Sequence, residues 1–271
     1  MVPRTAPEVI DGLEEVWASM LEATEGLEEA QWATPTACPG WDVRDQLSHL
    51  IGIERSLMGD APPAIELGET SHLRNPIGEM NELWVEERRG RSGDDVRTEF
   101  ADVTQRRLAE LRSYSEERFD EVGWSPIGQV PLRIFMLVRI MDSWMHEQDA
   151  REALGRSGGR GGIGETVAIS RADAALGLAI GKGAGATEGQ SVAIDIVGEL
   201  GGRRRLEVID GRATSVEGPD ATASITMSEE TYVRRFGGRI TSDEARLRDG
   251  TVLQGDIDLA GRVIDSLAVM I

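Results

Sequence analysis

Two histidines and one carboxylate in this sequence have the residue types of a three-ligand metal site. Asp142 and His146 are four residues apart, so on a helix they share one face, with Cβ atoms roughly 5–6 Å apart. His49 lies far upstream of this pair. Catalytic zinc commonly takes three protein ligands of these types and keeps a fourth position open. The pattern therefore indicates a divalent-metal site, although a solvated Asp/His pair on a helix surface has the same spacing.

Hydrophobic periodicity places these residues on helices. Apolar residues recur at intervals of three and four over residues 8–27 and 43–58, which predicts two amphipathic helices, the second capped by Asp42. His49 falls off the centre of the second apolar stripe, so we expect it to face a cleft between helices. Two more helices are predicted over residues 77–89 and after a cap at Ser92 or Asp94.

The most apolar helix is predicted from Pro131, a helix-starting proline, to Leu154, with Gly155 as its stop. The shoulder of its apolar stripe carries Asp142, His146 and Asp149. Helical bundles build metal sites from such inward-facing side chains. Residues 1–157 are therefore predicted to form a metal-binding helical bundle.

A glycine-rich segment, residues 155–162, predicts a flexible linker and a domain boundary. Beyond it, alternating patterns predict strands over residues 191–197, 205–209 and 224–227, and helices over 169–180, 228–236 and 259–269. Residues 181–189 lack the Lys-Ser/Thr ending of a phosphate-binding loop, which favours an ordinary loop. Residues 163–271 are thus predicted to be a smaller α+β domain.

Charge and composition restrict the partners. A net charge of −19 would repel phosphate, which argues against nucleic acid and anionic membranes. No apolar run approaches the ~20 residues of a membrane span, and the first residues lack a signal-peptide core. The single cysteine, Cys38, agrees with a reducing compartment. We expect a cytoplasmic protein.

Two segments carry a family resemblance: residues 32–50, which read WATPTACPGWDVRDQLSHL, and residues 142–155, which read DSWMHEQDAREALG. The chain resembles the mycothiol-dependent maleylpyruvate isomerase family of actinobacteria, within the DinB-like superfamily of metal-binding four-helix bundles. Its second half is similar to that family's second domain, which resembles sterol carrier proteins. The resemblance implies a DinB-like four-helix bundle followed by a smaller α+β, sterol carrier protein-like domain.

The resemblance also implies a zinc or other divalent ion held by His49, Asp142 and His146. The family's carboxylate is a glutamate, where this chain has the shorter Asp142. Coordination favours the nucleophilic thiolate of a low-molecular-weight thiol, here mycothiol. In an isomerase the thiolate would add to a cis-alkene, allow rotation and leave; in a transferase it would conjugate with a small electrophile. No catalytic residue beyond the metal ligands is predicted.

Four other charged residues have two interpretations each. Asp149 and Arg151 either contact a metal ligand and orient it, or form an ion pair that stabilises the helix. Arg88 and Arg89 either receive a carboxylate of the substrate or thiol, or belong to an ordinary charged surface.

Cys38 is expected to be a packed, inert thiol, and His72 a solvated side chain. Trp41 and Trp144 are expected in the core.

The sequence thus favours a metal-dependent, mycothiol-using isomerase or thiol S-transferase, as a monomer or homodimer. Its partners would be mycothiol and a small-molecule electrophile. One alternative is a protein that binds a metal or small ligand without turnover. Another is a stress-related relative that kept the ligands and lost the activity.

Overall fold

The computed structural model describes residues 1–68, 70–71 and 73–269. The chain divides into two compact units, residues 1–167 and residues 168–271. Among the described residues, no helix is both long and apolar enough to span a membrane. The prediction for His72 lies outside the described residues.

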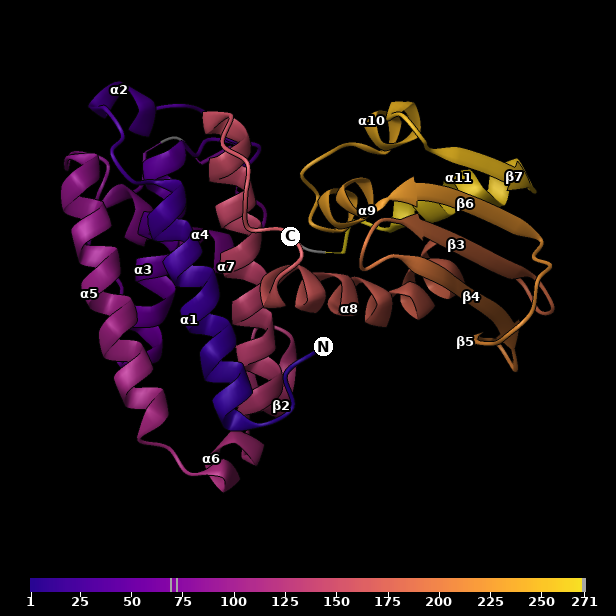
Figure 1. Cartoon of the computed structure of the whole chain (residues 1–271), viewed down its shortest axis with the longest axis horizontal. Helices are drawn as coiled ribbons and strands as arrows, with labels where there is room; N and C mark the ends of the chain where they lie inside the picture. Colours follow the sequence, from indigo (N-terminus) through magenta and orange to yellow (C-terminus); the bar gives the residue numbers. More distant parts are fainter. Residues whose placement is uncertain (69, 72, 270–271) are drawn as a thin grey trace. The chain divides into compact units, whose positions relative to one another are not determined.

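The first unit is built on four long helices: α1 (Ala6–Ala23), α3 (Val43–Leu57), α5 (Gly93–Arg112) and α7 (Leu132–Leu154). Helix α1 packs against α7 and α5, and α3 packs against the same two helices, which closes a four-helix bundle (Figure 1). Its core contains large apolar side chains at zero or near-zero exposure, among them Leu13, Trp17, Leu47, Phe100 and Ile140. The predicted helical bundle is confirmed.

Local signals explain where these helices begin and end. The Asp42 side chain accepts a hydrogen bond from the Asp45 backbone N–H, and the Asp45 side chain accepts one from the Asp42 backbone N–H. This capping box starts α3 at Val43. Ser92 rather than Asp94 caps α5. Pro131 precedes α7, and Gly155 ends it with a left-handed φ of 64°. Short helices α2 (Glu29–Trp32), α4 (Pro76–Glu86) and α6 (Glu116–Asp120) complete the helical part of the first unit, together with the first residues of α8 (Ile163–Leu178).

A β-hairpin precedes α7, in a segment for which the sequence analysis predicted no strand. Strands β1 (Val122–Ser125) and β2 (Gly128–Pro131) pair antiparallel. Ser125 donates its hydroxyl hydrogen to the Gly128 carbonyl at 2.8 Å, and Gly128 has a φ of 107°. The strands are short, and Trp124 in β1 is 71% exposed. The sequence therefore shows no clear alternation of apolar and polar residues that would predict them.

The second unit contains a five-stranded sheet of order β5-β4-β3-β6-β7. The strands are β3 (Ser191–Val197), β4 (Gly202–Ile209), β5 (Arg212–Ser215), β6 (Ala223–Ser228) and β7 (Val252–Gly255). Strand β3 pairs parallel with β6, while the other pairs are antiparallel. Helices α9 (Glu229–Phe236) and α11 (Ile257–Ser266) both pack on β6, and α10 (Ser242–Leu247) packs on both helices (Figure 1). The predicted α+β class is confirmed; the likeness to sterol carrier proteins stays a prediction.

Eight residues separate the end of α7 from the start of α8. Helix α8 continues into a π-helix at Ala179–Gly183, so the predicted loop at residues 181–189 begins with helical turns. Before α8, the glycine-rich segment is bound to α7. Trp144 donates its indole N–H to the Gly159 carbonyl at 2.6 Å, and Arg151 donates to the Ser157 carbonyl at 2.8 Å. A Cβ at Gly159 would collide with Glu147. A domain boundary between residues 157 and 163 stays a prediction.

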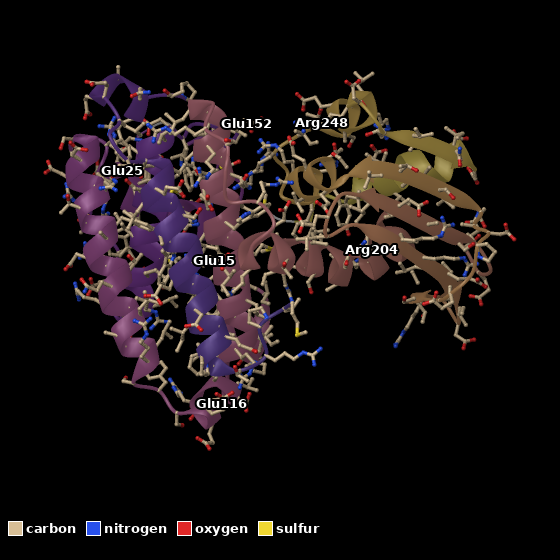
Figure 2. All side chains as sticks on the ribbon, in the orientation of Figure 1. Glu15, Glu25, Glu116, Glu152, Arg204 and Arg248 are labelled. Carbon is tan, nitrogen blue, oxygen red and sulfur yellow. The ribbon has the colours of Figure 1, made fainter. Side chains whose placement is uncertain are left out.

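The bundle surface is strongly acidic. Glu15, Glu25, Glu116 and Glu152 are exposed, and they project from its outer faces (Figure 2). This surface agrees with the repulsion of phosphate-rich partners expected from the net charge.

Candidate metal centre

The three residues singled out by spacing converge inside the bundle. His49 comes from α3, and Asp142 and His146 come from successive turns of α7. His49 Nε2 lies 3.3 Å from Asp142 Oδ2, and His146 Nε2 lies 3.6 Å from Asp142 Oδ1. One ligand atom of each residue lies within 4.8 Å of the others. Helix-to-helix packing therefore joins a pair that was visible in the sequence to a third residue about a hundred positions away.

Burial and charge set the protonation of the cluster. Burial, and then the nearby His146, lower the pKa of His49 to about 4, while Asp142 opposes the shift. Burial works to raise the pKa of Asp142, but Arg139, His146 and His49 together hold it well below its usual range. The cluster therefore presents a neutral His49 imidazole and an ionised carboxylate, the forms in which both bind metals.

A buried line of ion pairs supports Asp142. Arg139 Nη1 donates to Asp142 Oδ2 at 2.5 Å and Arg139 Nε donates to Glu54 Oε1 at 2.8 Å. Glu54 in turn accepts from Arg107 Nε at 3.3 Å. Arg139, Glu54 and Arg107 are 2%, 0% and 3% exposed, so water screens these pairs little. Glu110 extends the line from Arg107 toward solvent.

Trp41 covers the two histidine rings. Its ring centroid lies 5.0 Å from that of His49 and 5.8 Å from that of His146. The turn before α3 holds it there: Thr36 N–H donates to the Trp41 carbonyl at 3.0 Å, and Trp41 Nε1 donates to Glu82 Oε2 at 2.8 Å. Trp41 is only partly buried, so it forms a wall of the site, whereas Trp144 lies in the core as expected.

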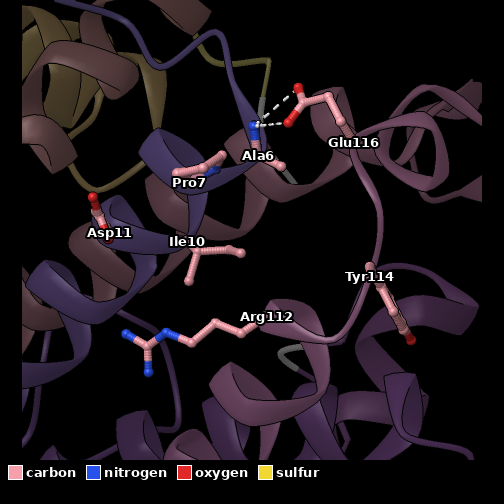
Figure 3. A pocket seen from close by; sticks show the side chains of 7 residues that line it. All are labelled: Ala6, Pro7, Ile10, Asp11, Arg112, Tyr114 and Glu116. Atoms are coloured by element: carbon pink, nitrogen blue, oxygen red, sulfur yellow. Dashed lines mark hydrogen bonds between the residues drawn. The ribbon is translucent and has the colours of Figure 1, made fainter.

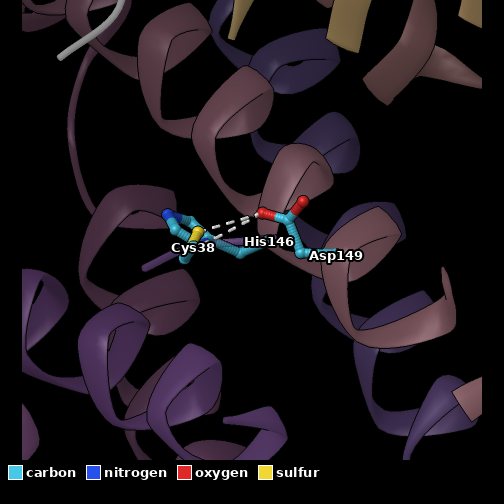
Figure 4. A group of neighbouring side chains, drawn as sticks. All are labelled: Cys38, His146 and Asp149. Carbon is cyan, nitrogen blue, oxygen red and sulfur yellow. Dashed lines mark hydrogen bonds and ion pairs between the residues drawn. The ribbon is translucent and has the colours of Figure 1, made fainter. Parts of the chain in front are cut away.

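The other edge of the His146 ring faces a second group of side chains. Cys38 Sγ lies 3.3 Å from Asp149 Oδ2, and that oxygen lies 3.9 Å from His146 Nδ1 (Figure 4). These three residues also satisfy the distances of a metal-ligand set. Gln46 Oε1 is closer still, 2.6 Å from His146 Nδ1. Cys38 thus packs against a carboxylate and an imidazole, and its inertness stays a prediction.

The four charged residues predicted to orient a metal ligand or to bind substrate fall into different surroundings. Asp149 contacts the cluster, but Arg151 binds Glu147 at 2.5 Å on another side of α7. Arg88 is 1% exposed and binds Glu99 through two nitrogens. Arg89 is one-third exposed and pairs with Glu82, the residue that also holds Trp41; the other carboxylates it contacts are those of Asp45 and Glu86. Arg89 is thus linked to the centre through Glu82 and Trp41, whereas Arg88 is held by Glu99.

A hollow of about 340 Å³ lies between the first turns of α1, the last residue of α5 and the start of α6 (Figure 3). Glu116 accepts the Ala6 backbone N–H there, at 3.1 and 3.2 Å from its two oxygens. The hollow is lined by Ala6, Pro7, Ile10, Asp11, Arg112, Tyr114 and Glu116. None of these residues belongs to the histidine cluster.

Sequence reasoning missed Gln46, Arg139 and Glu54. Arg139 left a usable signal, because it is a charged residue inside the most apolar helix, three positions before Asp142. Glu54 also lies on α3, five residues after His49. Neither helix pattern shows which charges face each other, so the pairing of Glu54 with Arg139 was not visible.

Fold and cluster together define the class: a helical bundle with a buried histidine–carboxylate centre, followed by an α+β unit. Residues 13–151 match the model of the mycothiol maleylpyruvate isomerase N-terminal domain. The chain belongs to this family, and the resemblance found in the sequence is confirmed. No curated protein matches the sequence.

Two solved structures share the fold over nearly the whole chain. The mycothiol-dependent maleylpyruvate isomerase is 17% identical, with a TM-score of 0.58, and 93% of each chain is covered. A mutant of the mycothiol-dependent maleylpyruvate isomerase is 18% identical, with a TM-score of 0.60 and the same coverage. Similarity at this identity establishes a common fold and leaves the activity of this chain to its own residues.

Proposed function

We propose that this chain binds a divalent metal ion, zinc in the first instance, through His49, Asp142 and His146. The observation that supports the proposal is the convergence of three ligand atoms from two helices within 4.8 Å. The separations of 3.3 and 3.6 Å between ligand atoms are those of neighbouring ligands around zinc, whose bonds to nitrogen and oxygen are about 2.0–2.2 Å. A neutral imidazole and an ionised carboxylate fit the ion without further deprotonation.

We further propose that the centre serves a low-molecular-weight thiol, mycothiol, in an isomerase or thiol transfer reaction on a small electrophile. When bound, the ion would supply the positive charge that favours the thiolate of a coordinating thiol. The residues of the chain orient and shield the centre: Arg139 holds one oxygen of Asp142, and Trp41 covers the histidine rings. Membership of the mycothiol maleylpyruvate isomerase family supports this thiol.

Arg89 is the proposed contact for an anionic electrophile. It is one-third exposed and lies beside the Glu82 that holds Trp41. A carboxylate substrate must approach an acidic bundle, so a cation at the rim would contribute binding that is equal in the ground and transition states. Arg89→Ala is then expected to raise KM more than it lowers kcat.

The test is metal content together with turnover. The purified protein should carry close to one divalent ion per chain, and His49→Ala should lose it. Ser48→Ala is the matched control: its buried side chain lies one position away on α3 and hydrogen-bonds only to the Arg44 carbonyl among the described residues. An equally loaded His49→Ala protein would remove His49 from the ligand set.

Turnover separates the enzyme from a binding protein. With mycothiol and maleylpyruvate or a simple electrophile, the loaded protein should react, and His49→Ala should not. Metal and thiol binding without any turnover would favour the non-catalytic alternative. Asp149→Ala should weaken metal binding less than His49→Ala, since loss of a residue behind the ligands usually reduces affinity about 10–100-fold.

A further inference from the structure

His146 lies between two sets of metal-ligating side chains. On its Nε2 edge are His49 and Asp142; on its Nδ1 edge are Cys38 and Asp149. Figure 4 shows the second set, in which the Cys38 sulfur and the Asp149 carboxylate lie against the ring. A neutral imidazole offers its lone pair on one nitrogen and a proton on the other. His146 can therefore join one set at a time, and the position of the ring proton decides which.

Gln46 fixes that proton through the orientation of its amide. Its Nε2 lies 2.8 Å from Thr36 Oγ1 and 3.3 Å from the Asp42 carbonyl oxygen. A carbonyl oxygen can only accept, so the Gln46 NH₂ group must face it. Thr36 Oγ1 donates to the Trp41 carbonyl at 2.9 Å and so accepts from Gln46. The turn before α3 therefore determines the direction of the amide.

The consequence for His146 follows from the same rule. With its NH₂ group committed, Gln46 presents Oε1 to His146 Nδ1 at 2.6 Å, and this oxygen can only accept. Nδ1 must therefore carry a proton, so in the neutral imidazole the lone pair lies on Nε2, the nitrogen 3.6 Å from Asp142 Oδ1. Gln46 is 0% exposed, so water does not compete for either end of the amide.

We propose that Gln46 is the positioning residue that directs His146 to the His49–Asp142 set and keeps it from the Cys38–Asp149 set. The proposal rests on the metal centre proposed above. Without the Gln46 carbonyl, the ring proton can move to Nε2, and Nδ1 can join Cys38 and Asp149. Cys38 would then bind as a thiolate, its proton released to solvent. The second set is thus a sulfur-containing metal position that the native amide disfavours.

The experiment uses cobalt(II) as the probe in the full chain. Wild-type protein loaded with one equivalent should show no sulfur-to-cobalt charge-transfer band in the absence of added thiol. Gln46→Leu should bind cobalt about 10–100-fold more weakly at the original centre and should gain that band. The band should disappear again in the Gln46→Leu/Cys38→Ser double variant. Ser48→Ala, at another buried polar position on α3, should behave as the wild type.

A second measurement needs no variant in α3. The chain has three histidines, so ¹⁵N spectra of the metal-free wild type, with His146 assigned by comparison with His146→Gln, report the tautomer of that ring. We expect the proton on Nδ1. A proton on Nε2, a sulfur band in the wild type, or a Gln46→Leu protein with unchanged affinity and no band would each overturn the proposal.

The two proposals fail in different ways. If neither the wild type nor His49→Ala binds metal, the metal centre is wrong, while the tautomer of His146 still tests Gln46. If the wild type binds metal through His49 and the tautomer is the opposite one, only the role of Gln46 is wrong.

Discussion

The two units bury charge in different ways. In the bundle, buried carboxylates face buried guanidinium groups, as Glu54 does with Arg107 and Arg139. In the second unit, the largely buried Arg235 donates mainly to backbone carbonyls, at 2.7 Å to Asp265 and 2.9 Å to Ile264. The first arrangement fixes the direction of side chains around the histidine cluster. The second fixes the path of the backbone.

The two units also differ in net charge, and the bundle is the more charged of the two. Residues 1–167 contain 32 acidic and 17 basic residues, a net charge of −15, whereas residues 168–271 contain 16 and 12, a net charge of −4. The unit with the more charged surface also has the more charged interior. We infer that buried charge in the bundle orients side chains around the histidine cluster, whereas in the second unit it stabilises the backbone, and four substitutions test that difference.

The largest effect is expected from Glu54→Gln. Removal of this carboxylate leaves Arg107 and Arg139 buried with one partner fewer each, and breaking a buried ion pair in this way costs roughly 3–5 kcal/mol. Denaturant unfolding of the metal-free protein measures the loss. Glu14→Gln is the control, because Glu14 pairs with Arg112 at 2.5 Å but both side chains are about half exposed. Equal losses in the two variants would contradict the comparison.

Arg235→Met should have the next largest effect, about 2–3 kcal/mol. The substitution keeps an apolar stem but leaves the Ile264 and Asp265 carbonyls without their donor, and a hydrogen bond to a charged group contributes about 1.5–3 kcal/mol. The metal content should not change, since the effect is on the backbone of the second unit. If the fully folded variant carried less metal than the wild type, Arg235 would affect the bundle as well as the backbone of the second unit, which would contradict the comparison.

Asp45→Asn tests charge in the bundle through pH. Burial, and then the nearby Asp42, raise the pKa of Asp45 to about 6 from 3.8. At Asp45 the folded state therefore binds more protons than the unfolded state between these values, so the contribution of this residue to native stability falls as pH rises from about 4 to 6 and is level above. The variant should lose this fall and gain about 2 kcal/mol relative to the wild type across that window. If the stabilities of the wild type and Asp45→Asn ran parallel from pH 4 to pH 7, the raised pKa of Asp45 would be excluded.

The smallest effect is expected from Asp195→Asn in the second unit. Asp195 pairs with Arg203 at 2.8 Å, but both side chains are about one-third exposed. Exposed pairs typically contribute less than about 1 kcal/mol and are screened by salt. Thermal unfolding at low and high ionic strength should differ little between variant and wild type. A loss as large as that of Glu54→Gln would mean that exposure does not decide the contribution of these pairs.

The sequence predicted the bundle well because local signals determine its helices. Asp42, Ser92 and Gly155 cap or stop helices by their own chemistry, so no knowledge of distant residues was needed. The β1–β2 hairpin and strands β5 and β7 are only four residues long and partly exposed, so they leave no clear alternating pattern. Strand β7 also pairs with β6, which lies well before it in the chain, so a local pattern does not contain its partner.

The site was predictable in part for the same reason. Asp142 and His146 share a helix face by spacing alone, and the sequence offered His49 as the third ligand, which the family resemblance supported. Gln46 was not predictable, since its role depends on the direction of its amide, which Thr36 and the Asp42 carbonyl set across a turn. Arg88 illustrates the opposite case: a charged residue that the sequence offered for substrate binding is buried against Glu99.

The placement of Trp41 gives the centre an optical reporter. Of the chain's six tryptophans, Trp17, Trp32, Trp84 and Trp144 are buried, and Trp124 is 71% exposed. Trp41 is the partly buried one whose ring lies against both histidines, so its emission is expected to respond to any change in the charge of those rings. The difference in fluorescence between the wild type and Trp41→Phe would isolate that response. Occupancy of the centre could then be followed in real time by light, without a label or a chromogenic substrate.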